Sequence, residues 1–162
     1  MNTLPTFPDD SLTVPPPLPE ELLTLIDRYD VLTGGELTAE TMQRLNVDQL
    51  TLYAYHIVRR EVMQGGFIQL IYNGYGGFIF HNPFAKVIRQ WGLDELATLI
   101  NKARKYEQRY GEQIASAQTD EDFMALYEQM PQFDDCDDAF VEKEEMFTSQ
   151  VAAYVRQHSG AF

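Results

Sequence analysis

Apolar side chains recur three and four residues apart along most of this chain. That spacing places them on one side of an α-helix, and in several segments a capping residue precedes it or a glycine follows it. The pattern predicts an all-α fold. The segments that carry it are 20–33, 38–44, 48–64, 82–91, 95–117, 119–130 and 139–159. The expected N-caps are Thr38, Asp48, Asn82, Asp94 and Thr119.

The start of the chain has a different composition. Six prolines fall within residues 1–19, which predicts an extended proline-rich arm. Residues 20–162 have the length and apolar content of a single helical domain with one core.

Residues 64–84 form an uncharged centre rich in glycine and phenylalanine. Apolar bulk beside several glycines predicts backbone segments that meet closely inside a core. Gly65 is placed to end the preceding helix in the left-handed conformation. Within the centre, residues 67–72 and 78–80 fit a short strand and a buried helix equally well.

Charge is distributed unevenly along the chain. There are 25 acidic and 12 basic residues, and the net charge is −13. Residues 1–55 contribute −7, residues 56–118 contribute +3 and residues 119–162 contribute −9. The densest acidic segment, residues 134–138, is expected to form a turn that caps the last helix. An acidic surplus concentrated in this way attracts basic protein surfaces and repels nucleic acid and anionic membranes.

Catalytic and metal-binding patterns are weak in this sequence. The single cysteine, Cys136, stands among four aspartates that oppose a thiolate. The glycines lack the spacing of nucleotide-binding loops, and the acidic segment lacks the central glycine of an EF-hand. We therefore expect no enzyme activity, no metal and no cofactor. A lone cysteine, with no signal peptide and no membrane-spanning run, favours a cytoplasmic protein.

Three polar residues of the uncharged centre leave a second hypothesis open. Gln69 and Asn73 are four residues apart beside aromatic side chains, and His81 follows them. Buried amides usually bond to backbone groups. If these side chains instead converge on a pocket, the chain is a small-ligand binding or enzymatic domain.

The uncharged centre also resembles a known family. The pattern Gly-Gly-Phe-x-Gln-x-x-x-Asn at residues 65–73, a helix ending in Trp-Gly at residues 91–92 and a long helix from Asp94 are similar to the bacterial DNA-mimic protein family. The resemblance covers roughly residues 50–115. It implies an all-helical homodimer whose negative surface has the shape of duplex DNA. Such a protein occupies the DNA-binding face of a helix-turn-helix transcription regulator and blocks operator binding, without itself binding nucleic acid or membrane.

The charge distribution supplies the candidate contact residues. Carboxylates three or four apart on a helix lie ~5–6 Å from one another, so acidic helices can imitate rows of phosphates. One row is expected within residues 134–145, and another at residues 27–30 or 120–122. The candidates are Asp27, Asp30, Asp120, Asp122, Asp134, Asp135, Asp137, Asp138, Glu142 and Glu145.

Overall fold

The computed structural model describes residues 16–162, and the regular secondary structure of these residues is entirely helical. The prediction of an all-α fold is confirmed. Most of the predicted proline-rich arm lies outside the described residues. The helices are α1 (Glu20–Thr33), α2 (Ala39–Met42), α3 (Val47–Tyr72), α4 (Gly76–Phe80), α5 (Phe84–Gln90), α6 (Asp94–Ala115), α7 (Asp120–Gln129), α8 (Gln132–Gln157) and the 3₁₀ helix η1 (Ser159–Ala161).

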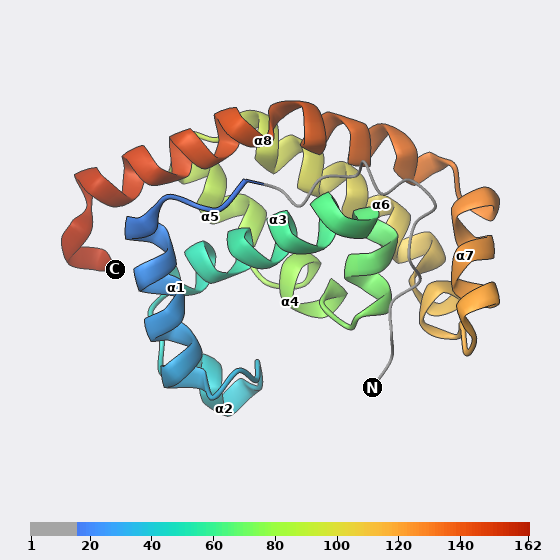
Figure 1. The fold of residues 1–162 in the computed structure, drawn as a ribbon, viewed down its shortest axis with the longest axis horizontal. Helices are drawn as coiled ribbons and strands as arrows, with labels where there is room; N and C mark the ends of the chain where they lie inside the picture. Colours follow the sequence, from blue (N-terminus) through green and yellow to red (C-terminus); the bar gives the residue numbers. More distant parts are fainter. Residues whose placement is uncertain (1–15) are drawn as a thin grey trace.

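Helix α3 is the central element of the fold (Figure 1). It packs against α8, α6, α1, α5 and α4. Most of its residues from Thr51 to Ile71 are buried, as expected of a helix that is covered on nearly all sides. Helix α8 runs along the length of the molecule, with α1 towards one end and α7 at the other (Figure 1). None of the described helices is long and apolar enough to cross a membrane.

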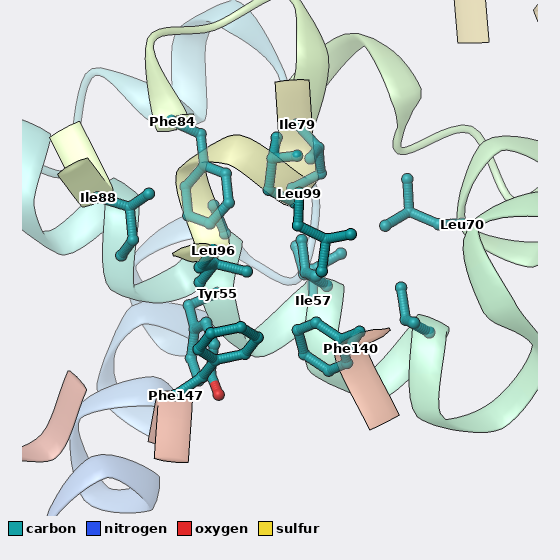
Figure 2. Close-up of a cluster of buried hydrophobic side chains, with 14 of the residues drawn as sticks. Tyr55, Ile57, Leu70, Ile79, Phe84, Ile88, Leu96, Leu99, Phe140 and Phe147 are labelled. Atoms are coloured by element: carbon teal, nitrogen blue, oxygen red, sulfur yellow. The ribbon is translucent and has the colours of Figure 1, made fainter. Parts of the chain in front are cut away.

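The apolar residues of the uncharged centre lie mostly in the hydrophobic core, as predicted. Phe67, Ile68 and Leu70 are fully buried. Their neighbours come from five helices, so α3 to α6 and α8 share one cluster (Figure 2). Burying each large apolar side chain contributes about 1.5–3 kcal/mol, and this cluster therefore holds the long helices in fixed positions. Figure 2 labels Tyr55, Ile57, Leu70, Ile79, Phe84, Ile88, Leu96, Leu99, Phe140 and Phe147.

The structure decides between the two readings of the uncharged centre. Residues 67–72 continue α3 after a kink, and residues 78–80 belong to α4, so neither segment is a strand. The prediction for Gly65 is wrong. Gly65 has φ −150°, whereas Gly66 has φ 73° and ψ −176°, and the helix resumes after it. The glycine pair therefore bends α3 and does not end it.

Helix starts that depend on local capping were predicted best. Thr38 and Thr119 each cap a helix through a capping box, as expected. The predicted caps Asp48, Asn82 and Asp94 are wrong, because Asn46, Pro83 and Leu93 occupy those positions. The predicted acidic turn at residues 134–138 is also wrong. These residues lie inside α8, which starts at Gln132 directly after Pro131.

Candidate functional site

Five acidic side chains lie together on the exposed side of α8. The first two are adjacent and the others follow at intervals of three and four residues, so the five follow one another along the same side of the helix. At 1.5 Å per residue, the eleven steps from the first to the last span about 16 Å, or about three turns. All five are exposed. This acidic row consists of Asp134, Asp135, Asp138, Glu142 and Glu145.

No cation forms an ion pair with the acidic row within the described part of the chain. Helix α8 contains two basic residues, and both pair with other helices. Lys143 Nζ lies 2.8 Å from Glu95 Oε2 on α6, and Arg156 pairs with Glu21 on α1. The row therefore presents uncompensated negative charge, with neighbouring carboxylates at a spacing suited to contact several cations of a basic surface.

Asp137, expected in the same row, turns inward instead. Its Oδ1 accepts a hydrogen bond from the backbone N–H of Phe67 at 2.8 Å. Burial raises the pKa of the Asp137 carboxyl from its ordinary value to about 7, although the bond from Phe67 opposes the shift. Asp134 and Asp138 add to the rise, because their negative charges disfavour a third one nearby. Asp137 therefore takes part in contacts inside the protein and is not a member of the exposed row.

The inward Asp137 holds the kink of α3. Gly66 adopts a backbone conformation that essentially only glycine tolerates, and a Cβ added there would lie 2.3 Å from Asp137 Oδ2. On the other side of the kink, the Tyr127 hydroxyl of α7 donates to Gly65 O at 2.7 Å. The glycine pair thus allows α7 and α8 to bond directly to the backbone of the central helix.

A second inward carboxylate, Glu144, joins α8 to α3 further along. Its Oε1 accepts from Arg59 Nε at 2.6 Å and from Thr148 Oγ1 at 2.8 Å. Arg59 and Glu144 are 7% and 3% exposed, so this is a buried ion pair. Arg59 Nη2 also donates to Pro16 O, which fixes the start of the described chain. Glu144 is not among the acids that the charge distribution singled out. Its position four residues after Phe140 and three before Phe147 is the signal that it lies on the buried side.

The candidate acids of other helices lie apart from the acidic row. Asp27 of α1 and Asp120 of α7 are exposed. Asp30 accepts a hydrogen bond from the Tyr53 hydroxyl, and Asp122 accepts from the backbone N–H of Thr119 in the capping box. Helices α1 and α7 lie at opposite ends of the molecule (Figure 1). The structure thus brings five of the ten candidates into one continuous row, and three others, Asp30, Asp122 and Asp137, accept hydrogen bonds within the protein.

The three residues of the small-ligand hypothesis do not converge on one pocket. Gln69 is fully buried, and its Nε2 donates to Glu61 Oε2 at 2.7 Å. Asn73 Nδ2 donates to the same oxygen at 3.0 Å. His81 is exposed and its Nε2 lies 3.2 Å from Glu107 Oε1. A hollow of about 620 Å³ lies beside His81 between α4 and α6, and neither amide lines it.

The described residues also bear on metal binding and on thiol chemistry. Within residues 16–162 no three histidine, cysteine or acidic side chains are grouped so that they could hold a metal ion. Cys136 is buried, and burial raises the pKa of its thiol to about 11. Such a thiol stays protonated at neutral pH and is a poor nucleophile.

Comparison with known proteins agrees with the resemblance seen in the uncharged centre. The model of the DMP19-like protein family matches residues 43–158, which include the kink of α3 and the acidic row. The DNA mimic protein DMP19 of Neisseria meningitidis serogroup B (strain ATCC BAA-335 / MC58) is 32% identical over 142 residues, which cover 87% of this chain and 86% of that protein. The chain therefore belongs to the DMP19-like protein family.

Proposed function

We propose that this protein is a DNA mimic that occupies the DNA-binding surface of a DNA-binding protein. The observation that carries the proposal is the acidic row of α8, which is exposed and forms no ion pair with any residue of 16–162, in a chain of this family. Duplex DNA presents rows of negative phosphates to the proteins that bind it, and Lys and Arg side chains supply much of the attraction. A rigid row of carboxylates offers the same side chains a similar target.

The rigidity of the row supports this function. Mimicry requires carboxylates at fixed positions, because ordering them during binding reduces affinity. Helix α8 is fixed from its buried side by the Asp137 bond to Phe67 and by the Glu144–Arg59 pair. The acids on its other side are therefore held in place before a partner arrives.

We extend the proposal to the kind of partner and to the assembly. The partner is a helix-turn-helix transcription regulator, and its occupation prevents operator binding. A homodimer doubles the acidic row and matches the two-fold symmetry of many DNA-binding dimers. The protein acts in the cytoplasm, where its single buried cysteine stays reduced. We assign it no catalytic reaction, and its relative is named as a DNA mimic.

Capture from a native lysate tests the proposal. Immobilised protein is incubated with the lysate at low salt, and the bound proteins are eluted with duplex DNA or with high salt. We expect to capture a basic DNA-binding protein that duplex DNA displaces from the immobilised protein. In a separate binding assay, adding this protein should release that DNA-binding protein from its operator DNA. The mass of the purified complex, measured by light scattering, shows whether two copies of this chain are present.

Two variants with the same net charge separate the acidic row from general attraction. The row variant carries Asp134→Lys, Asp138→Lys and Glu145→Lys, and we expect its affinity to fall at least about a hundredfold. The control variant carries Glu36→Lys, Glu40→Lys and Glu128→Lys, which are exposed positions outside the row. At ~0.15 M salt, charges beyond ~8 Å are screened, so we expect a much smaller loss. Equal losses in both variants refute the role of the row, and a partner that keeps its operator refutes mimicry.

A further inference from the structure

One stretch of this acidic protein contains no acids. Residues 62–93 contain no aspartate or glutamate, although the whole chain carries 25 of them. Helix α5 lies in this stretch and packs against α6. Between α4, α5 and α6 the surface is hollowed by about 420 Å³. The hollow is lined by Ile79, Phe80, Asn82, Pro83, Ala85, Lys86, Arg89, Gln90, Ile100, Asn101 and Arg104.

Three cations surround this basic hollow, and none of its lining residues is acidic. Lys86 and Arg104 form no ion pair with any residue of 16–162, and Arg89 Nη2 donates to the uncharged Thr98 Oγ1 at 3.2 Å. Arg59 and Lys143 each have a carboxylate partner, whereas Lys102 and Lys105 of α6 have none among residues 16–162, so what distinguishes the hollow is that three cations surround it and no acid lines it. Like charges around one hollow repel each other, and an anion between them would remove that repulsion.

The groups around the hollow fit a phosphate. Arginine binds phosphate oxygens through two parallel N–H bonds, and lysine adds a point charge. The side-chain amides of Gln90 and Asn101 add further donors. The floor is apolar, since it is formed by the side chains of Ile79, Phe80 and Ile100, which are almost completely buried.

We propose that this basic hollow binds a phosphorylated small molecule that carries at least two negative charges. Its volume lies within the ~300–1,000 Å³ of small-molecule sites. The floor accepts the apolar part of such a ligand and the rim accepts its phosphates. A nucleic-acid strand fits less well, because the rest of this chain is strongly negative and repels a polyanion. The site does not depend on DNA mimicry, since no residue of the acidic row lines it.

Calorimetry and amide NMR with two probes, inorganic pyrophosphate and adenosine diphosphate, test the proposal on the full chain. We expect saturable binding of both probes, weaker at higher salt, with amide shifts confined to α4, α5 and the facing part of α6. The double variant Arg89→Gln and Arg104→Gln should bind each probe at least about tenfold more weakly. Both side chains are exposed, so circular dichroism should show an unchanged helix content.

A matched control keeps the test specific to the hollow. Lys102→Gln and Lys105→Gln remove the same charge from exposed positions of α6 that do not line the hollow. This control should bind both probes within about twofold of the unchanged protein. The proposal is overturned if neither probe binds saturably, or if both double variants lose affinity equally. Tighter binding of a short DNA duplex than of either probe would also overturn it, because the surface would then be a nucleic-acid contact.

Discussion

The two sides of α8 carry the same residue types and use them in opposite ways. On the inner side, Asp137 and Glu144 each meet defined partners, the Phe67 N–H and the Arg59 guanidinium. On the outer side, the five acids of the acidic row meet no cation among residues 16–162. The helical position relative to the buried Phe140 and Phe147 is what separates them. The side of α8 on which an acidic residue lies therefore decides its role. Acids on the buried side bond to the protein interior, and acids on the exposed side are accessible to a partner.

This difference also separates stabilising acids from destabilising ones. Like charges three or four apart on a helix destabilise it by about 0.2–0.5 kcal/mol per pair. The acidic row contains several such pairs and no internal compensation, so it lowers the stability of the isolated protein. The inner contacts to α3 and the packed core offset that loss. A surface that costs stability in the free protein is best explained by what it binds.

The largest effect is expected from removing the inner carboxylate Glu144. In Glu144→Ala the buried Arg59 loses its partner, and breaking one side of a buried ion pair costs about 3–5 kcal/mol. Thr148 also loses an acceptor. Urea denaturation should show this loss as a lower midpoint.

Glu142→Ala, on the exposed side of α8, is the control for Glu144→Ala. Glu142 is exposed and its side chain bonds to no described residue, so the free energy of unfolding should change by no more than about 0.5 kcal/mol. If Glu142→Ala and Glu144→Ala destabilise the protein equally, the distinction between the two sides of α8 is wrong.

The kink of α3 is expected to give the next largest effect. Gly66→Ala forces a side chain into a glycine-only conformation, which costs about 1–3 kcal/mol, and pushes its Cβ against Asp137. Gly77→Ala is the control, because Gly77 lies in α4 with open space around it. There, alanine should leave stability unchanged or raise it by about 0.4–1 kcal/mol. The midpoints of thermal unfolding of both variants measure these changes. If Gly66→Ala is as stable as the unchanged protein, the backbone at Gly66 does not require glycine.

The sequence predicted those features that are decided locally. The spacing of apolar residues predicts that each long helix exists, although it ends α3 at the kink and begins α8 seven residues late. The Thr38 and Thr119 caps are read from four consecutive residues. The sequence predicts a helix end at Gly65 where the structure has a kink, because the kink depends on partners from far along the chain. Asp137 and Tyr127 bond to the two sides of the glycine pair, and nothing within α3 indicates either contact.

The candidate site shows the same limit. The three- and four-residue spacing of acids in α8 was sufficient to predict an acidic row. The segment 134–138 was misread as a turn because its density of acids resembles a cap, whereas the burial of Phe133 and Cys136 draws it into the helix. The inward direction of Asp137 needed the kink of α3, which only the three-dimensional fold provides.

The sharpest test of the inner side of α8 is the pH dependence of stability caused by Asp137, an effect expected to be no larger than that of Gly66→Ala. Burial raises the pKa of this carboxyl to about 7, while in the unfolded chain it ionises near pH 4. Between these values the folded protein holds a proton that the unfolded chain has lost, so the contribution of Asp137 to stability falls as pH rises. Asp137→Asn cannot ionise. Between pH 5 and 8 the stability of the unchanged protein relative to this variant should therefore fall by roughly 1–3 kcal/mol.

Urea denaturation at several pH values measures this difference, and the comparison cancels other titrating groups. His56 is one of them, because burial lowers its pKa to about 4 and its contribution to stability is lost as pH falls from about 6.5 towards 4. Both proteins keep His56, so its effect drops out. Glu142→Gln, five positions further along α8 and exposed in the acidic row, is the matched control, because Glu142 is not among the charges that raise the pKa of Asp137, and its pH dependence should be much smaller. If Asp137→Asn and Glu142→Gln show the same pH dependence, Asp137 is not held in a buried site and the two sides of α8 do not differ as the contacts indicate.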